Sequence, residues 1–155
     1  LNRPFTNMTV LENVMVSLLN GREPVQKVKQ ARTESEAILA TTGLSEKRLM
    51  RSGTLGYVDR KRVEVARALG ARPKLLLLDE VMTGLNMREI EDVMELVQEI
   101  RNTGTTVIVV EHVMKAVLGI SDKVIVLNAG QKIFEGTPRE VMNDGQVVEA
   151  YLGEC

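Results

Sequence analysis

Two unbroken apolar runs in the second half of the chain restrict its fold more than any other feature. Leu75–Leu78 consists of four leucines, and Thr106–Val110 is rich in β-branched residues. Strands that do not alternate with polar residues are typical of a parallel sheet that helices cover on both faces. Between the runs, apolar residues recur at helical spacing from Met87 to Ile100. Residues 75–110 are therefore predicted to form a right-handed β-α-β unit whose strands are buried on both sides.

The first third of the chain is predicted to be helical. Thr9 and Glu12 have the spacing of a capping box, and an apolar stripe at helical spacing follows them until Gly21. Pro24 is suited to the first turn of a second helix, which we expect to close near Gly43.

These patterns predict an α/β fold in two parts. We expect residues 1–72 to form a helical subdomain, whose last helix runs over Asp59–Leu69, and residues 73–155 to carry the sheet. Near the end, Lys123–Leu127 and Gln131–Glu135 flank a short turn and are predicted to pair as a hairpin.

The composition fits an ordinary folded domain. Of the 155 residues, 44% are hydrophobic and 26% are charged, and the formal net charge is -1. A dedicated binder of nucleic acid or of anionic membranes needs a basic excess, which this chain lacks.

Cys155 is the only cysteine, so a disulfide framework and a cysteine-based metal site are excluded. No apolar run approaches the roughly 20 residues of a membrane-spanning helix, and the start, Leu1–Pro4, does not have the pattern of a signal peptide.

Two adjacent carboxylates follow the first apolar run. Asp79 and Glu80 stand directly after Leu78, and ligands of open parallel sheets bind beyond the carboxyl ends of the strands. One carboxylate there can hold Mg²⁺ while the other orients an attacking water. The alternative is a pair of solvated or capping residues in a turn, and the pair alone does not decide between the two interpretations.

The second apolar run ends in Glu111 and His112, the only histidine in the chain. If the two runs are neighbouring strands, about 4.8 Å apart, His112 projects from the same sheet edge as Glu80. A neutral imidazole in that position can form a hydrogen bond with a phosphate oxygen. The alternative is a structural histidine at a strand end.

A further candidate segment, Leu55-Gly56-Tyr57-Val58-Asp59, precedes the basic residues Arg60-Lys61-Arg62. The amino-terminal end of a helix can receive an anion, but the segment taken alone favours a plain loop in which Asp59 caps the helix. The basic cluster has no interleaved aromatic residues, so nucleic-acid binding is not expected. The chain contains neither G-x-x-x-x-G-K-[ST] nor G-x-G-x-x-G.

In this order and spacing, the segments resemble the second half of an ATP-binding-cassette (ABC) transporter ATPase over essentially the whole chain. Leu75–Glu80 is similar to the Walker B strand with its catalytic glutamate, and Glu111-His112 is similar to the end of the switch-histidine strand. Gly84-Leu85-Asn86 resembles the D-loop, and Leu55–Asp59 resembles the signature segment. The resemblance implies a helical subdomain followed by a partial P-loop (RecA-like) parallel-sheet core.

Other segments are similar to the branched-chain amino-acid uptake ATPases and their urea or amide relatives. They are Asn7–Val14, Ile120–Lys123, Glu135–Pro138 and the ending Ala150–Gly153. The resemblance implies an ATP-hydrolysing importer subunit that uses ATP and Mg²⁺ on the cytoplasmic face of the cell membrane. It further implies a second ATPase subunit, in a homo- or heterodimer, and membrane permease subunits as partners.

The resemblance also implies a role for each candidate residue. Asp79 would help to hold Mg²⁺, Glu80 would polarise the attacking water, and His112 would contact the γ-phosphate. Leu55–Asp59 would close over the nucleotide of the partner subunit, and Gly84–Asn86 would cross to that subunit.

The chain departs from the family pattern in several places. The Walker A lysine loop and the Q-loop glutamine belong before Leu1. Gly56 replaces a Ser or Thr, which removes a phosphate donor, and Val58 replaces a Gly, whose loss obstructs close backbone approach. Val113 stands where an Asp commonly follows the histidine.

We therefore expect a partial chain with little or no ATP affinity of its own. Two alternatives stay open. One is a non-catalytic interaction fragment that docks on a permease or on an intact ATPase. The other is a non-transport ABC ATPase that acts on DNA or the ribosome, although the coiled-coil, zinc or linker insertions usual in such proteins are not visible in the sequence.

Overall fold

The computed structural model describes residues 4–151 and divides into two compact units. Unit 1 comprises Leu1–Leu77 and Glu99–Ile108, and unit 2 comprises Leu78–Gln98 and Val109–Cys155. The division passes through strands, so the boundary expected between residues 72 and 73 stays a prediction.

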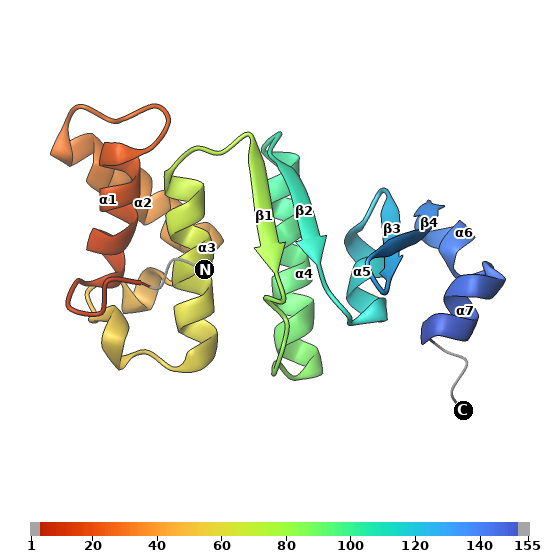
Figure 1. Ribbon diagram of the computed structural model, residues 1–155. Helices are drawn as coiled ribbons and strands as arrows, with labels where there is room; N and C mark the ends of the chain where they lie inside the picture. The colour runs from red at the N-terminus through yellow and green to blue at the C-terminus, as the bar shows by residue number, and fades with distance from the viewer. Residues whose placement is uncertain (1–3, 152–155) are drawn as a thin grey trace. The chain divides into compact units, whose positions relative to one another are not determined.

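The elements of Figure 1 are α1 (Val10–Asn20), α2 (Val28–Thr41), η1 (Ser45–Lys47), η2 (Ser52–Thr54), α3 (Tyr57–Gly70), β1 (Leu75–Asp79), α4 (Met87–Asn102), β2 (Thr106–Val110), α5 (Met114–Ile120), β3 (Val124–Asn128), β4 (Gln131–Gly136), α6 (Pro138–Val141) and α7 (Gly145–Tyr151).

Three helices form the main body of unit 1. Helix α1 contacts both α2 and α3, and α2 contacts α3. Their apolar faces meet in one core, which drives the packing because burial removes apolar surface from water. Its buried members are Val10, Leu11, Val14, Leu18, Val25, Ala31, Leu39, Leu44, Leu55, Val63 and Ala66.

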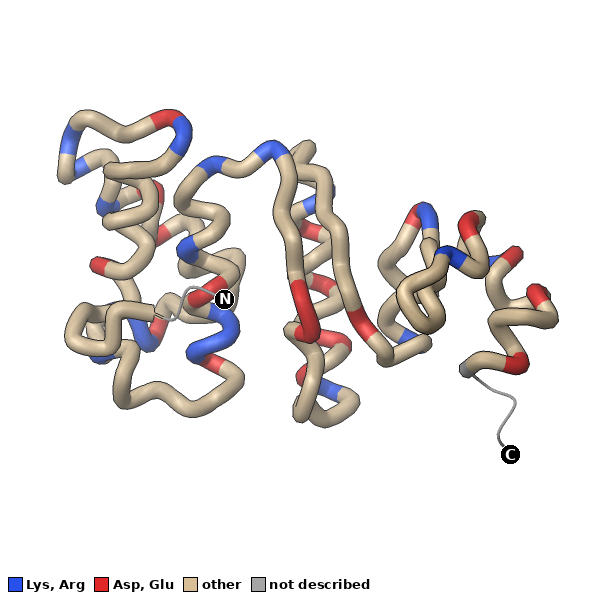
Figure 2. Tube along the Cα trace, in the orientation of Figure 1, with Lys and Arg blue, Asp and Glu red and all other residues tan. Residues whose placement is uncertain are grey.

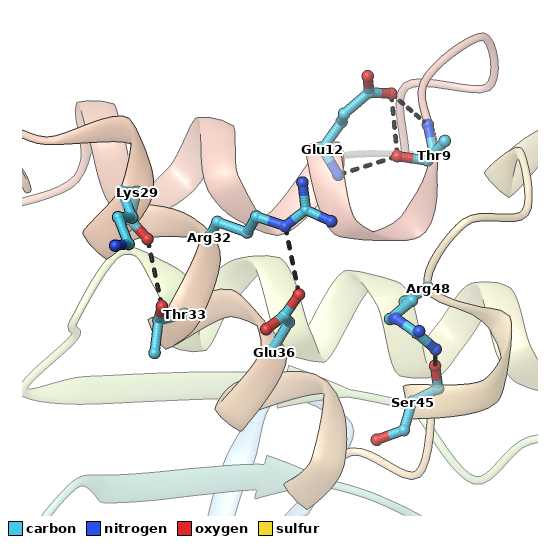
Figure 3. Close-up of polar contacts among 8 residues, drawn as sticks. All are labelled: Thr9, Glu12, Lys29, Arg32, Thr33, Glu36, Ser45 and Arg48. Atoms are coloured by element: carbon cyan, nitrogen blue, oxygen red, sulfur yellow. Dashed lines mark hydrogen bonds and ion pairs between the residues drawn. The ribbon is translucent and has the colours of Figure 1, made fainter.

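Helix α1 begins with the capping box that the sequence predicts. The Glu12 amide donates to the Thr9 hydroxyl at 3.1 Å, and the Thr9 amide donates to Glu12 Oε2 at 2.7 Å (Figure 3). These bonds satisfy amides that the first helical turn leaves without partners. The backbone hydrogen bond from Thr9, followed by that of its hydroxyl, holds the pKa of Glu12 below its ordinary value. Thr137 and Glu140 repeat the motif at the start of α6.

The second helix begins later than the sequence predicts. It starts at Val28 rather than at Pro24. Val25 is buried, and its amide donates to the Leu18 carbonyl at 2.9 Å. This contact holds the chain near Pro24 against α1, so the helical turn starts only after it. The predicted closure is confirmed, since Gly43 has φ of +69° just after the helix.

Strands β1 and β2 are hydrogen-bonded neighbours and run in the same direction in Figure 1. The predicted β-α-β unit is therefore confirmed, but the expected burial on both faces is wrong. Leu76 and Leu78 are buried, whereas Leu75 and Leu77 are 49% and 64% exposed. A strand face becomes buried only where another element covers it, and the described part of the chain covers one face of β1.

The predicted hairpin near the end of the described residues is confirmed. Strands β3 and β4 pair antiparallel as a hairpin, with Val124 opposite Gly136. The turn between them places Ala129 and Gly130 at φ of +46° and +78°, the left-handed pair that suits a two-residue hairpin loop. Helices α6 and α7 contact β4. The buried residues of this part are Val124, Val126, Val141 and Val147, with Val117, Leu118, Ile133 and Phe134 packed against them.

A buried polar cluster fixes two loops of unit 1 to α1. The Asn13 amide nitrogen donates to Ser52 Oγ at 2.8 Å and to the Phe5 and Thr9 carbonyls at 3.1 and 2.9 Å. Its oxygen accepts from the Phe5 amide at 2.8 Å, and Ser52 Oγ is within 3.0 Å of the Met8 carbonyl. Asn13 and Ser52 are 0% exposed, so each of these groups depends on the others for its hydrogen bonds.

We expect Asn13→Ala to lower the free energy of unfolding by about 3 kcal/mol, because it leaves several buried polar groups without partners. Urea denaturation followed by circular dichroism measures the change. The matched control is Asn20→Ala, since Asn20 is exposed and its side chain donates to the Val16 carbonyl one turn earlier in the same helix. A loss for Asn13→Ala no larger than that for Asn20→Ala would contradict the importance of the cluster.

Candidate functional site

The predicted acidic pair lies at the carboxyl end of β1. Asp79 is the last residue of the strand, Glu80 follows it, and both are exposed. Glu80 has φ of +49°, in the left-handed region that residues other than glycine seldom adopt. Its amide donates to the Val110 carbonyl at 2.9 Å. The backbone is thus held in a costly conformation at the position where the sequence predicts chemistry.

His112 stands two residues beyond Val110, where β2 ends, and its side chain is exposed. The Glu80–Val110 hydrogen bond joins the two strand ends, so the expectation that both segments leave one sheet edge is confirmed for the backbone. Acidic residues mark the ends of both strands in Figure 2. The roles of the Asp79, Glu80 and His112 side chains stay predictions.

The predicted D-loop residues connect β1 to α4. Gly84 has φ of +77°, and the Leu85 amide donates to the Met82 carbonyl at 3.2 Å. Asn86 caps α4: its Oδ1 accepts from the Glu89 amide at 3.1 Å, and Glu89 Oε2 accepts from the Asn86 amide at 2.8 Å. Asn86 therefore stabilises the start of α4, whether or not it also contacts a partner subunit.

The predicted signature segment straddles the start of α3. Leu55 is buried, Gly56 precedes the helix in extended conformation, and Tyr57 is its first residue. The expectation that Asp59 caps the helix is wrong, because the helix begins two residues earlier. Asp59 lies in the first turn, where its carboxylate accepts from Lys47 Nζ at 2.5 Å.

Two features of this segment bear on ligand binding. A Cβ atom at Gly56 would meet nothing within 4 Å, so the position is open toward solvent. Val58 is half-buried, and Tyr57 is 50% exposed with Lys61 Nζ 5.8 Å from its ring centroid. The helix start is therefore accessible, and the basic residues that follow add to its attraction for anions.

The structure distributes the candidate residues over both units. Unit 1 contains the segment Leu55–Asp59. Unit 2 contains the other candidates, which are Asp79, Glu80, Gly84–Asn86 and His112. Within residues 4–151, no three His, Cys, Asp or Glu side chains form a group that could hold a metal ion. None of the helices in this range has the length and apolar character needed to cross a membrane. The predictions that involve Leu152, Gly153 and Cys155 lie outside the described residues.

Sequence reasoning missed two residues of structural importance. Asn13 interrupts the apolar stripe of α1, and an amide at such a position is a signal for a buried polar contact. Glu111 attracts attention only as the neighbour of His112, yet its Oε1 accepts from the Met82 amide at 2.7 Å. Its distant partner could not be predicted from spacing.

Comparison with known proteins identifies the family. A family described as "ABC transporter" matches residues 2–83, and one described as "Branched-chain amino acid ATP-binding cassette transporter" matches residues 131–154. The chain belongs to the ABC transporter family, as an ATP-binding domain.

Two curated relatives illustrate the range of the likeness. The chain is 38% identical to the high-affinity branched-chain amino acid transport ATP-binding protein LivG of Salmonella typhimurium, over 99% of this chain and 65% of the relative. It is 35% identical to the lipopolysaccharide export system ATP-binding protein LptB of Haemophilus influenzae, over 97% of this chain and 61% of the relative. The chain thus spans less than two thirds of the length of these relatives.

Solved structures agree with the predicted fold. MJ1267, an ATP-binding cassette of an ABC transporter in its ADP conformation, matches with a TM-score of 0.79 and 29% identity over 96% of this chain and 64% of that one. The dimeric bacterial ABC transporter cassette MJ0796 matches with a TM-score of 0.77 and 25% identity over 88% of this chain and 59% of that one. The fold class, a helical subdomain with a partial P-loop parallel-sheet core, is confirmed.

The left-handed backbone at Glu80 leads to a stability prediction. We expect Glu80→Gly to be more stable than Glu80→Ala by about 1 kcal/mol, because glycine alone adopts positive φ without a steric cost. Thermal unfolding of the two variants measures the difference. The same pair of changes at the exposed Glu95 within α4 should give the opposite sign, since glycine weakens a helix. A more stable alanine variant at position 80 would contradict the strain.

Proposed function

We propose that this chain acts as the ATP-hydrolysing subunit of an ABC importer for branched-chain amino acids or related small solutes. The observation that carries the proposal is the pairing of β1 with β2, in which the Glu80 amide bonds to the Val110 carbonyl. This bond joins the strand end that bears Asp79 and Glu80 to the one that leads to His112. The likeness to LivG and the family match over residues 131–154 support the choice of solute.

In this proposal each side chain at the sheet edge has one task. The Glu80 carboxylate accepts a hydrogen bond from the attacking water and polarises it, and the exposed His112 imidazole donates to the γ-phosphate of ATP. The fixed backbone at Glu80 supports its task, because a carboxylate held at a strand end loses little orientational freedom when the substrate binds.

Asp79 fits the Mg²⁺ that accompanies ATP in such enzymes. Mg²⁺ is held by one or two carboxylates together with waters and substrate phosphates rather than by a full set of protein ligands. One exposed carboxylate at the strand end is therefore a suitable donor. When bound, the ion neutralises charge on the phosphates.

We assign the start of α3 to the nucleotide of a second ATPase subunit. The accessible helix start at Gly56 and the basic residues after it suit a phosphate group. The segment Gly84–Asn86, whose Gly84 has positive φ, would contact the same subunit. The dimeric cassette MJ0796 supports a paired arrangement, in a homo- or heterodimer.

We further propose that membrane permease subunits dock on the helical part of unit 1. Phe5, Met8, Leu49 and Met50 are 44%, 36%, 63% and 44% exposed. Their two segments are joined by backbone bonds, among them the Met8 carbonyl with the Ser52 amide at 3.0 Å. Exposed apolar residues gathered on a fixed backbone are typical of a protein contact. The chain would then act on the cytoplasmic face of the membrane, without nucleic acid.

Specific observations also favour two other functions. The likeness to LptB favours a transporter of another solute in the same family. Gly56 and Val58, in place of the hydroxyl and glycine of the family signature, favour a non-catalytic subunit that binds a permease or an intact ATPase without turnover. A non-transport ATPase has no such support.

The first test concerns the nucleotide affinity of the 155-residue chain alone. We expect dissociation constants for a fluorescent ATP analogue weaker than about 1 mM, because P-loop enzymes take most phosphate contacts from the G-x-x-x-x-G-K-[ST] loop that these residues lack. Equilibrium fluorescence anisotropy measures the constant. Micromolar affinity would contradict the expectation.

The second test concerns turnover in the complex with permease and partner subunits, where the parent rate is measured first because the 155 residues lack the phosphate-binding loop. Glu80→Gln should lower kcat for ATP hydrolysis by about 100-fold or more, since the amide is too weak a base to polarise water, and should leave nucleotide binding nearly unchanged. Phosphate release measures the rate. Glu95→Gln is the control, because Glu95 is an exposed carboxylate of α4. Equal rates for the two variants would refute the role of Glu80.

A further inference from the structure

The loop that leaves β1 is attached to the end of β2 at two places. The first is the bond between the Glu80 amide and the Val110 carbonyl, at 2.9 Å. The second is made by a side chain: Glu111 Oε1 accepts from the Met82 amide at 2.7 Å. Met82 is 1% exposed and Glu111 is half-buried, so this second bond is partly shielded from water.

Two buried polar atoms beside this bond have no hydrogen-bond partner among residues 4–151. They are Glu111 Oε2 and the hydroxyl of Thr83, the residue that follows Met82. An unpartnered buried oxygen is unfavourable, and a carboxylate is a costly group for packing alone. Glu111 Oε1 accepts from the Met82 amide, and Glu111 Oε2 is buried away from solvent. This argues that the side chain acts on the loop and does not contact substrate.

The held loop carries the residue with the least favourable backbone near the site. Glu80 keeps a φ of +49° only if its surroundings impose that conformation. The two attachments lie at Glu80 itself and two residues later, so together they define the path of the chain through this point. Loss of the second would let the loop between Glu80 and Gly84 relax.

We propose that Glu111 is a positioning residue, which holds the β1–α4 loop through the Met82 amide and thereby orients the Glu80 carboxylate. The role of Glu80 in this statement rests on the proposed function, whereas the hold on the loop does not. Glu111→Gln keeps an oxygen that can accept from the Met82 amide, and Glu111→Ala removes it. The two variants therefore separate the hydrogen bond from the charge.

The hold on the loop is tested by amide hydrogen exchange of the full chain, resolved by NMR. In Glu111→Ala the Met82 amide should exchange roughly tenfold faster or more, the factor that one lost hydrogen bond gives, while the Val126 amide of β3 keeps its rate. Glu111→Gln should stay within about threefold of the parent chain. Equal acceleration at Met82 and Val126, or no acceleration at Met82, would overturn the proposal.

The orienting effect is tested in the assembled complex. Glu111→Ala should lower kcat for ATP hydrolysis about tenfold or more with KM within about twofold, and Glu111→Gln should restore most of the rate. An unchanged kcat in Glu111→Ala would overturn the orienting role. If the parent complex itself does not hydrolyse ATP, the proposed function fails, and the exchange experiment still decides whether Glu111 holds the loop.

Discussion

The register between β1 and β2 is the constraint on which the candidate site depends. The Thr106 amide bonds to the Lys74 carbonyl where the strands begin, and the Glu80 amide bonds to the Val110 carbonyl where they end. A slip of one residue would exchange the two faces of a strand, so that Leu76 and Leu78 would leave the interior. It would also separate the strand end at Glu80 from the one that leads to His112. The burial of Leu76 and Leu78 thus fixes the register of β1 and β2, on which the proposed site at their ends depends.

Unit 1 combines apolar packing with one buried polar cluster. The helices α1 to α3 gain their stability from the shared apolar core, which is non-directional. The hydrogen bonds of Asn13 and Ser52 add direction, because they are satisfied in a single arrangement of the segments near Phe5 and Met8. Ser52 lies three residues before Leu55, so this cluster also fixes the chain just before the start of α3.

The candidate residues of the site could be predicted from the sequence, but the hydrogen bonds that join them could not. The sequence predicts Asp79, Glu80 and His112 as candidates, because unbroken apolar runs predict strands and the ends of parallel strands are where ligands bind. The capping role predicted for Asp59 is wrong, because the helix begins at Tyr57 and Asp59, in its first turn, pairs with Lys47. The bond that the Met82 amide donates to Glu111 joins residues 29 apart, and no local pattern predicts it.

The sequence by itself determined the kinds of elements, their order and the family. Capping boxes, helical stripes and apolar runs act over a few residues, so their outcome is decided before the chain folds further. Only the tertiary structure decided which faces and polar atoms are buried. The exposure of Leu75 and Leu77, the left-handed backbone of Glu80 and the partner of Glu111 all depend on which segments meet in space. Burial and hydrogen bonding depend on contacts between segments, and the contacting residues are often distant in the sequence.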